Sequence, residues 1–412
     1  MSKINQLSFK RNFSWNFIGS LVSSASRFFI IMLLAKLGDP VMVGLYSIGM
    51  AITSPIISLT NLQLRQIQAT DTVDKLYTFK DYFGLRTIMN ILMLVLTLSV
   101  VLLNNYSIEK SLIVLLIGLE RAIDAFRDVF FGHLQQRERM DYIGKSRVIK
   151  GISTIVVLGI VLFLTNNLLI SLIALNILGL TIFFYYDRKK LQLFLKDIKP
   201  SFKYRKLKSL FILALPLGFV LMLNSLNTNL PRIIVEKLLG EAALGYFSSI
   251  AYLLVVGNTF VQAVGQAAAP RLAKLYNEKK FTKFKKIVNY LIVMGMSLGF
   301  LGLIVSTFLG KFLLTVLYDS TYADYNHILV LIMLAGVFSF TRSFLGYGLT
   351  SMRYFKIQPY INCLAVIATV TLSIILVPKY NLTGAAYTLI IASFIQCLLY
   401  YLVIKQKLKY SV

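Results

Sequence analysis

The sequence predicts an all-α integral membrane protein with about 12 transmembrane helices in two six-helix halves, and three observations lead to this prediction. Hydrophobic residues make up 57% of the 412 positions. Apolar runs of about 20 residues, long enough to cross the hydrocarbon layer as helices, recur along the whole chain. Lysine and arginine gather in alternate connections between these runs. A multi-pass helical membrane protein accounts for all three.

The apolar runs can be placed in order along the chain. The fourth and tenth are the least cleanly apolar. The longest polar connection, 187–208, is too short for a soluble domain, and near it we divide the chain into an N-terminal bundle, 1–200, and a C-terminal bundle, 201–412. We expect spans near 12–34, 42–62, 83–104, 111–131, 148–165, 168–186, 209–233, 243–265, 287–309, 326–347, 357–377 and 383–404.

The formal net charge of +26 comes from lysines and arginines in the connections between the apolar runs. This location does not indicate a nucleic-acid partner. Cytoplasmic connections of membrane proteins collect lysine and arginine. This rule places both termini in the cytoplasm of a protein of the cell membrane, with the basic clusters 188–190, 203–208 and 279–286 facing anionic membrane lipids. Of the 43 lysines and arginines, the connections then expected outside hold only Lys36, Lys110, Lys237, Lys311 and Lys379.

The two halves resemble each other weakly. A shift of 201 positions matches Gly44 with Gly245, and a shift of 214 matches Gly132 with Gly346. Because six helices per half is an even number, both halves enter the membrane in the same direction. We therefore expect a pseudo-twofold axis along the membrane normal with a cleft between the halves. Chance similarity among apolar segments is the alternative.

Arginines occur inside the apolar runs, where a guanidinium costs roughly 2.5–3.5 kcal/mol. Arginine cannot avoid this cost by losing its proton. Several such residues in one chain predict a water-filled cavity that binds anions. These arginines are Arg27, Arg121, Arg127, Arg232 and Arg342.

Polar residues share a face with two of these arginines. In the first span, Asn16, Ser20, Ser23 and Arg27 recur at helical spacing. The seventh span repeats the pattern, and we expect both stripes to line the cleft. Small and amide residues that only hold helices together are the alternative. The stripe of the seventh span consists of Asn224, Asn227, Thr228, Pro231 and Arg232.

The fourth span carries a ladder of charges, Glu120, Arg121, Asp124, Arg127 and Asp128. Neighbours three or four residues apart on a helix can neutralise one another. The three carboxylates are also candidates for coupling to H⁺ or Na⁺, because burial and adjacent arginines shift carboxyl pKa values. A static salt-bridge ladder and a coupling role both stay open.

The sequence offers little for an enzyme. It contains two histidines, His133 and His327, and no His, Cys and Asp cluster has the spacing of a metal site. A phosphate-binding P-loop, which direct coupling to ATP would need, does not occur. We expect no catalytic residue, no metal and no cofactor, with H⁺, Na⁺ or the membrane potential alone as the source of energy.

The chain resembles the Wzx-type polysaccharide flippases of the multidrug/oligosaccharidyl-lipid/polysaccharide exporter superfamily. The likeness extends over essentially the whole chain, and the order and spacing of its motifs carry it. These motifs are AKLGDPVMVGLYSIGMA (35–51), NLPRIIVEKLLGEAALGYFSS (229–249), APRLAKLYNEKKFTKFKKI (269–287) and VPKYNLTGAAYT (377–388).

The resemblance implies a bundle that alternates between inward- and outward-open states and carries a polyprenyl-diphosphate-linked oligosaccharide in a cationic cavity. Arg27 and Arg232 lie where that family places positive charge, and we expect them to bind the diphosphate with support from Arg342 and Arg127. A polysaccharide polymerase and chain-length machinery would be partners. Two other functions stay open, a cation-coupled multidrug exporter of the same superfamily and an integral-membrane polysaccharide polymerase or ligase.

Overall fold

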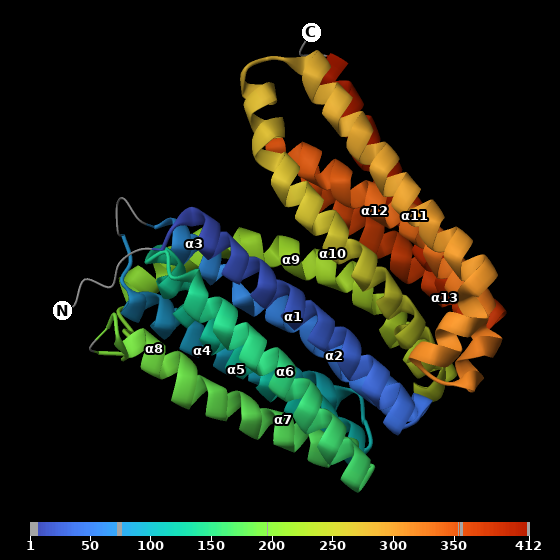
Figure 1. Ribbon diagram of the computed structural model, residues 1–412, viewed down its shortest axis with the longest axis horizontal. Coiled ribbons are helices and arrows are strands. Elements are labelled where there is room, and N and C mark those ends of the chain that lie inside the picture. The colour runs from blue at the N-terminus through green and yellow to red at the C-terminus, as the bar shows by residue number, and fades with distance from the viewer. Residues whose placement is uncertain (1–6, 72–75, 196, 353, 355–356, 410–412) are drawn as a thin grey trace. The chain divides into compact units, whose positions relative to one another are not determined.

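A computed structural model describes residues 7–71, 76–195, 197–352, 354 and 357–409. Every regular element within these ranges is helical (Figure 1). The elements are α1 (Phe9–Leu37), α2 (Pro40–Asn61), α3 (Leu64–Thr70), α4 (Phe79–Leu103), α5 (Ile108–Gln136), α6 (Met140–Thr165), α7 (Leu168–Ile182), the π-helical η1 (Phe183–Arg188), α8 (Lys189–Gln192), α9 (Tyr204–Leu239), α10 (Glu241–Asn277), α11 (Phe281–Leu317), the 3₁₀-helical η2 (Ser320–Tyr325), α12 (Asn326–Ser351) and α13 (Gln358–Lys409).

Ten helical segments among the described residues are long and apolar enough to cross a membrane, which confirms the all-α membrane class. Nine of the twelve expected runs each lie in one of these ten segments. The run 111–131 lies in α5, which is outside the ten because charged residues interrupt it. The runs 357–377 and 383–404 both lie in α13, whose backbone leaves helical geometry at Asn381 (φ 52°, ψ −134°).

Polar residues just before several helices explain where these helices begin. The first backbone N–H groups of a helix have no partner inside it. Thr78 and Asp81 form a capping box at the start of α4, with Asp81 Oδ2 accepting from the Thr78 N–H at 2.9 Å. At the starts of α5 and α7 the cap residue itself accepts, Ser107 Oγ from the Lys110 N–H at 3.3 Å and Asn167 Oδ1 from the Ile170 N–H at 3.1 Å. These local signals position helices that apolar composition alone would leave free to shift.

The chain forms two compact units. The first contains the chain up to Gly38 and Ile48–Ser225, and the second contains Asp39–Ser47 and the chain from Leu226 onward. The chain therefore passes from one unit to the other after Gly38, inside α2 after Ser47, and inside α9 after Ser225. The division between residues 200 and 201 that the sequence suggests stays a prediction.

Within the first unit, α6 packs between α1 and α7, and α5 contacts α3, α4 and α7 (Figure 1). Aromatic rings fill the space around α5. Phe130 stacks on Phe183 with ring centroids 5.0 Å apart. The rings of Phe79 and Phe83 lie 5.8 and 5.7 Å from the ring of Phe130, centroid to centroid. This apolar packing encloses one end of the charge ladder of α5.

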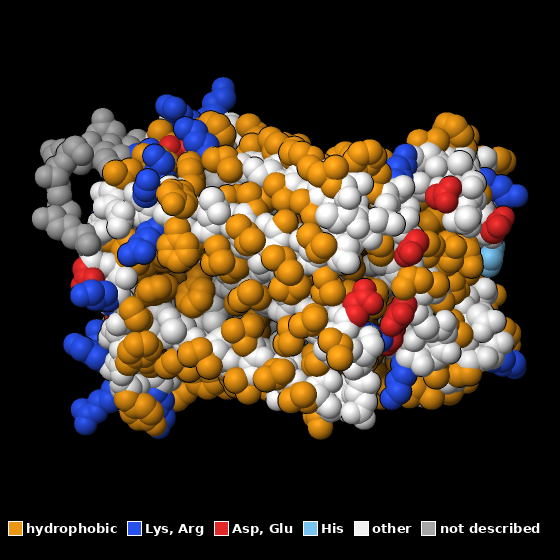
Figure 2. All heavy atoms as spheres, turned by 90° about the horizontal axis from the view of Figure 1, so that it is seen from below, with side chains coloured by type: hydrophobic (Ala, Val, Ile, Leu, Met, Phe, Trp, Pro, Cys, Tyr) orange, Lys and Arg blue, Asp and Glu red, His pale blue; other side chains and the backbone are white. Residues whose placement is uncertain are grey.

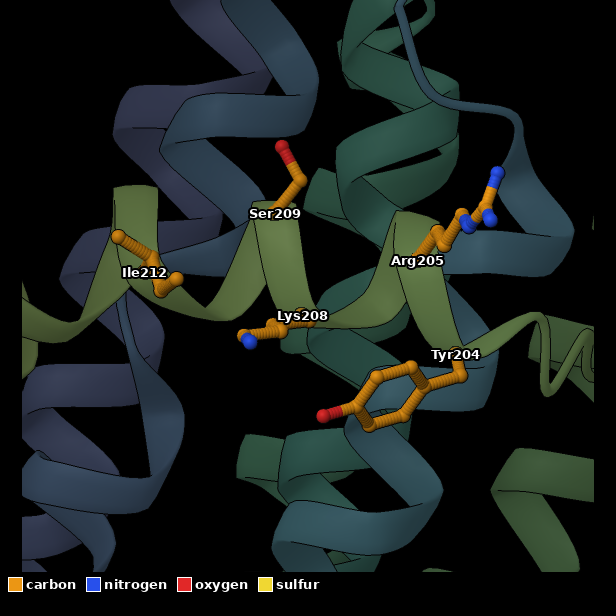
Figure 3. A pocket seen from close by; sticks show the side chains of 5 residues that line it. All are labelled: Tyr204, Arg205, Lys208, Ser209 and Ile212. Atoms are coloured by element: carbon orange, nitrogen blue, oxygen red, sulfur yellow. The ribbon is translucent and has the colours of Figure 1, made fainter.

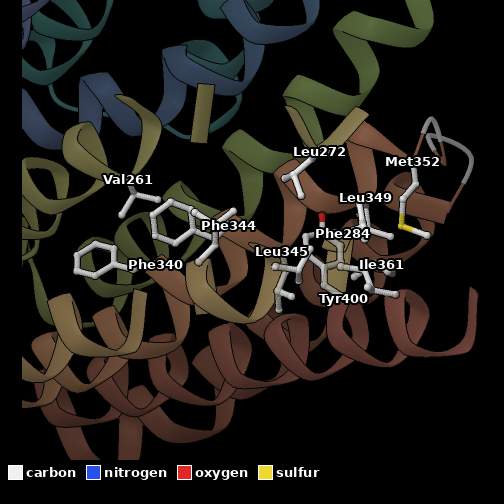
Figure 4. Packing of buried hydrophobic residues seen from close by; sticks show 13 residues of the cluster. Val261, Leu272, Phe284, Phe340, Phe344, Leu345, Leu349, Met352, Ile361 and Tyr400 are labelled. Carbon is white, nitrogen blue, oxygen red and sulfur yellow. The ribbon is translucent and has the colours of Figure 1, made fainter. Parts of the chain in front are cut away.

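Within the second unit, α12 packs against α10, α11 and α13. Figure 4 shows their shared core, a buried cluster that includes Val261 and Leu272 of α10 and Phe340 and Phe344 of α12. Burying such side chains against one another removes them from the lipid as well as from water.

Two glycines in the second unit make a reciprocal contact. A β-carbon on Gly44 would collide with the backbone carbonyl of Glu241, and one on Gly245 would collide with the carbonyl of Pro40. Residues 40 and 44 are offset from 241 and 245 by the same 201 positions that relate the two halves of the sequence. The shift relates Pro40 to Glu241 and Gly44 to Gly245. It therefore turns the contact of Gly44 with Glu241 into that of Gly245 with Pro40, as a twofold axis would.

The outer faces of the helices are strongly apolar. Figure 2 shows hydrophobic side chains over much of the visible face, with lysine and arginine side chains at both ends and more of them at the left. Phe163 of α6 and Phe308 of α11 are 75% and 81% exposed. A soluble monomer rarely exposes apolar patches of this extent. The exposed faces are suited to contact lipid.

Candidate functional site

The polar face of α1 lies against α6, its neighbour in Figure 1. Asn12 Oδ1 accepts a hydrogen bond from the Met140 backbone N–H at 3.0 Å, close to the beginning of both helices. Further along, Gly19 and Gly144 let the backbones approach, since a β-carbon on Gly19 would lie only 2.8 Å from the Gly144 Cα. The two helices are thus held in a fixed register without help from charged groups.

Arg147 of α6 binds to this polar face. Its Nη1 donates to Ser20 Oγ at 3.0 Å and to Asn16 Oδ1 at 3.4 Å. Both acceptors are neutral, and Arg147 forms no ion pair with a described residue. Asn16 and Ser20, which the sequence places along the cavity, therefore hold a second arginine. Arg147 lies one residue outside the apolar run 148–165, which is why the sequence did not mark it.

Arg27 lies further along the same face of α1 and is exposed. Its Nη1 donates to Ser23 Oγ at 3.3 Å and its Nη2 to Ser24 Oγ at 3.1 Å. No carboxylate among the described residues pairs with it. Its charge is therefore available to an anion.

Arg127 of α5 is in a different situation, since it is 3% exposed and all three of its guanidinium nitrogens are engaged. Nε donates to Asp187 Oδ2 at 2.6 Å, Nη1 to Asp124 Oδ1 at 3.0 Å, and Nη2 to Ser146 Oγ at 2.7 Å. Ser146 in turn donates to Asp187 Oδ1 at 2.5 Å. This geometry favours a structural role for Arg127. Its binding of a diphosphate stays a prediction from the sequence.

The carboxylates of the α5 ladder also form ion pairs with lysine and arginine side chains of the first unit. Lys150 Nζ lies 2.6 Å from Asp124 Oδ1 and 3.3 Å from Glu120 Oε1. Asp128 Oδ1 lies 3.2 Å from Nη1 of Arg65. These pairs join α5 to α3 and α6 and favour the static ladder. The coupling of Asp124, Asp128 and Glu120 to an ion stays a prediction.

Asp187 is a member of this network that the sequence placed in the connection after the sixth span. It is 2% exposed because η1, a short π-helical segment at the end of α7, turns it inward toward Arg127. Such π-bulges are rare and are frequent at functional sites. The one feature of the sequence that could have pointed to Asp187 is its position directly after the apolar run 168–186.

Two further arginines of the first unit have structural partners. Arg86 of α4 is completely buried and donates to the backbone carbonyls of Thr60 at 3.3 Å and Asn61 at 3.0 Å, at the end of α2. Cations stabilise the unsatisfied carbonyls at a helix C-terminus. Arg121 of α5 contacts the sulfur of Met50 at 2.7 Å.

In the second unit, Arg232 of α9 is partly buried and its Nη1 lies 3.4 Å from Asn229 Oδ1. No carboxylate among the described residues pairs with it. The predicted stripe of this helix divides, because Asn224 and Thr228 are exposed whereas Asn227 is buried. The cavity-lining role of all three residues stays a prediction.

Arg342 of α12 ends a buried chain of amide and hydroxyl groups. Its Nη1 donates to Gln396 Oε1, which also accepts from Asn227 Nδ2 at 3.1 Å. Thr369 donates to Asn227 Oδ1 at 2.7 Å. Nε of Arg342 and Nε2 of Gln396 are buried and make no hydrogen bond within the described residues. Arg342 therefore keeps its full charge and an unused donor.

A shallow basic pocket of about 400 Å³ lies at the start of α9 (Figure 3). Arg205 and Lys208 are exposed, and the hydroxyl of Ser209 lies 2.9 Å from that of Tyr77. Tyr204 and Ile212 complete the lining. The described residues contain no cluster of three or more His, Cys, Asp or Glu side chains that could hold a metal ion.

Comparison with known proteins agrees with this arrangement. The family described as polysaccharide biosynthesis protein matches residues 9–276, and the MatE family matches residues 216–375. The capsular polysaccharide biosynthesis protein CapF of Staphylococcus aureus is 32% identical over 394 residues, which are 95% of this chain and 98% of CapF. A putative O-antigen transporter of Shigella flexneri is 23% identical over 52% of this chain and 50% of its own.

Solved structures share the fold at low sequence identity. The lipid II flippase MurJ in an inward closed conformation superposes with a TM-score of 0.75 at 15% identity, over 95% of this chain and 87% of its own. An inward-facing multidrug resistance transporter of the MATE family superposes with a TM-score of 0.71 at 15% identity, over 100% of this chain and 97% of its own. The chain belongs to the polysaccharide biosynthesis protein family, and its fold is similar to that of transporters of the multidrug/oligosaccharidyl-lipid/polysaccharide exporter superfamily.

Proposed function

We propose that this protein moves a polyprenyl-diphosphate-linked oligosaccharide from the inner to the outer leaflet of the cell membrane, for the assembly of a surface polysaccharide. It acts as a transporter rather than an enzyme, and a polysaccharide polymerase uses the cargo that it delivers. The similarity to CapF over almost the whole of both chains supports the cargo class.

The observation that carries the proposal is a set of arginines whose charge no carboxylate of the described residues neutralises. Arg27 in the first unit is held only by serine hydroxyls, and Arg232 and Arg342 in the second are held only by amide oxygens. Arg127, by contrast, sits among carboxylates. A positive charge without a partner is costly inside a membrane unless an anionic cargo or water compensates for it.

The charge of the cargo also supplies a driving force. A diphosphate diester carries about two negative charges, and each gains about 2.3 kcal/mol per 100 mV when it moves out of a negative cell interior. The total of about 4–5 kcal/mol makes ATP unnecessary. Coupling to H⁺ or Na⁺ would add to this force.

The proposal includes twelve crossings in two halves, with both termini in the cytoplasm and a pseudo-twofold axis along the membrane normal. The contacts of Gly44 with Glu241 and of Gly245 with Pro40 support the symmetry, since the shift of 201 positions turns one contact into the other. Alternation between inward- and outward-open states requires that the cargo bind differently to the two states. Release of a phosphate by one arginine and its capture by another would provide that difference.

A translocation assay tests the proposal. Purified protein is reconstituted into vesicles with a polyprenyl-diphosphate oligosaccharide, and an impermeant lectin reports its exposure with and without a membrane potential. We expect exposure that needs the protein and falls at least tenfold in Arg27→Gln and Arg232→Gln. Arg11→Gln, a change at an exposed position near the beginning of α1, should leave the rate unchanged. Full activity of Arg27→Gln would refute the role of this residue.

A cation-coupled multidrug exporter is the second candidate, because the MatE family matches residues 216–375. Such a protein would expel a cationic dye from vesicles when a proton or sodium gradient is imposed. Its activity should depend on Asp124 or Asp128 and should survive the loss of Arg27. Dye transport without any exposure of lipid-linked glycan would favour this candidate over the flippase.

A further inference from the structure

In the first unit, two arginines bind to the polar face of α1, Arg147 from α6 and Arg27 from α1 itself. Arg147 donates to Ser20 and Asn16, nearer the beginning of α1. Arg27 donates to Ser23 and Ser24, further along the helix. Ser20 and Ser24 are four residues apart, which is about one helical turn or roughly 5.4–6 Å along the axis. The hydroxyls that hold the two guanidiniums are therefore neighbours on a single face.

Arg147 is the arginine that its surroundings leave without a counter-ion. Three guanidinium carbons surround the ring of Phe131, with Arg127 at 5.5 Å, Arg65 at 5.6 Å and Arg147 at 6.0 Å from its centroid. Arg127 is paired with Asp187 and Asp124, and Arg65 is paired with Asp128. Those carboxylates are thus already engaged, and Arg147 keeps a charge that only neutral oxygens contact.

A purely mechanical link between α1 and α6 does not explain a charge at this position. The register of the two helices already comes from the bond of Asn12 and the close approach of Gly19 and Gly144. One nitrogen of Arg147 makes both of its hydrogen bonds, at 3.0 and 3.4 Å, and a glutamine could replace them. Nε and Nη2 make no hydrogen bond within the described residues, although a guanidinium offers five N–H donors.

We propose that Arg147 of α6 and Arg27 of α1 form a two-arginine site at the polar face of α1. This site recognises a diphosphate, with one phosphate at each guanidinium. Two adjoining phosphates can accept charge-assisted hydrogen bonds from both arginines at once, whereas a single phosphate engages one of them fully. Arg147 is nearer the beginning of α1, the cytoplasmic end in the proposed topology, so an incoming headgroup meets it before Arg27. The inference rests on the proposed function for its cargo and adds the residue that selects diphosphate over monophosphate.

The protein contains a reporter for this site. Trp15 is the single tryptophan of the chain and directly precedes Asn16 on α1. It also packs beside α6, because a β-carbon on Gly144 would lie within 3.1 Å of the Trp15 β-carbon. Its fluorescence can therefore follow the binding of soluble anions to the full-length protein in detergent.

The experiment titrates Trp15 fluorescence with inorganic pyrophosphate and, separately, with inorganic phosphate. We expect pyrophosphate to bind roughly tenfold or more tightly, since it can accept charge-assisted hydrogen bonds from both arginines at once. In Arg147→Gln and in Arg27→Gln this preference should fall to about twofold or less. Arg147→Lys, which keeps the charge, should retain part of it. Arg205→Gln, in the basic pocket at the start of α9, should leave it intact.

Two results would overturn the inference. The first is an Arg147→Gln protein that elutes like the parent in size-exclusion chromatography and keeps the full preference for pyrophosphate. The second is a loss of the preference in Arg205→Gln, which would locate recognition in the pocket of Figure 3.

A transport arm separates failure of the inference from failure of the proposed function. The vesicle assay is repeated with diphosphate- and monophosphate-linked forms of one glycan. If the parent protein exposes neither, the proposed function fails, while the fluorescence result still decides whether an anion site exists. If Arg147→Gln transports both with an unchanged diphosphate preference, the flippase stands and the role of Arg147 is wrong.

Discussion

At the residue scale, the arginines of the membrane-spanning helices fall into two groups. Arg127 sits among Asp187, Asp124 and Ser146, whereas Arg27 and Arg147 contact only neutral oxygens. An arginine that is permanently paired adds no charge to a cavity, and one that is unpaired attracts an anion. The spacing of arginines along the sequence cannot separate these groups, since the partners come from other helices.

The buried network of Arg127 should be costly to break. Asp187→Asn leaves the charge of Arg127 buried without its nearest carboxylate, and removing one partner of a buried ion pair costs about 3–5 kcal/mol. We expect a clear fall in the thermal unfolding temperature in detergent. Asp197→Asn is the matched control, because Asp197 and its partner Lys80 are both 47% exposed. The hydrogen bond from Lys80 lowers the pKa of Asp197, yet an exposed pair should leave the unfolding temperature unchanged. Equal unfolding temperatures for Asp187→Asn and the parent would show that the network is not structural.

At the element scale, glycines decide how closely the helices approach. Gly245→Ala forces a β-carbon into the carbonyl of Pro40, and such overpacking costs about 1–3 kcal/mol. Gly159→Ala in α6 should be neutral or stabilising by up to about 1 kcal/mol, because its nearest neighbour, Leu33, would be 3.9 Å away and alanine favours helices. Thermal unfolding of both variants checks the difference. If Gly245→Ala is as stable as Gly159→Ala, the close contact between the beginnings of α2 and α10 does not form.

At the scale of the whole molecule, the number of crossings depends on α5 and α13. The charged residues of α5 exclude it from the apolar segments that length and composition identify, and α13 contains two expected runs on either side of the kink at Asn381. If both crossings of α13 and the crossing of α5 occur, the connections alternate sides along the whole chain.

Single cysteines read by an impermeant thiol reagent in intact cells check this alternation, after Cys363 and Cys397 have been replaced. We expect labelling from outside at Asn105→Cys, Asn166→Cys and Asn381→Cys, and protection at Glu138→Cys and Glu278→Cys. Labelling of Glu138→Cys from outside would mean that α5 does not cross. Protection of Asn381→Cys would mean that α13 does not turn back at this residue.

The sequence by itself determined the membrane class, the positions of the apolar runs and the arginines inside them. These properties depend on local composition, since each apolar run and each charge is visible along the chain. The family resemblance likewise followed from motifs in order. The capping of α4 by Thr78 and Asp81 is local too and lies within reach of sequence reasoning.

Only the tertiary structure decided which charges neutralise one another. Asp187 reaches Arg127 because a π-helical turn at the end of α7 turns it inward, and Arg147 meets α1 because close contact at Gly19 and Gly144 fixes the register of α6. Both contacts join residues that are far apart in sequence. Their formation depends on the packing of whole helices, and helical periodicity describes only one helix at a time.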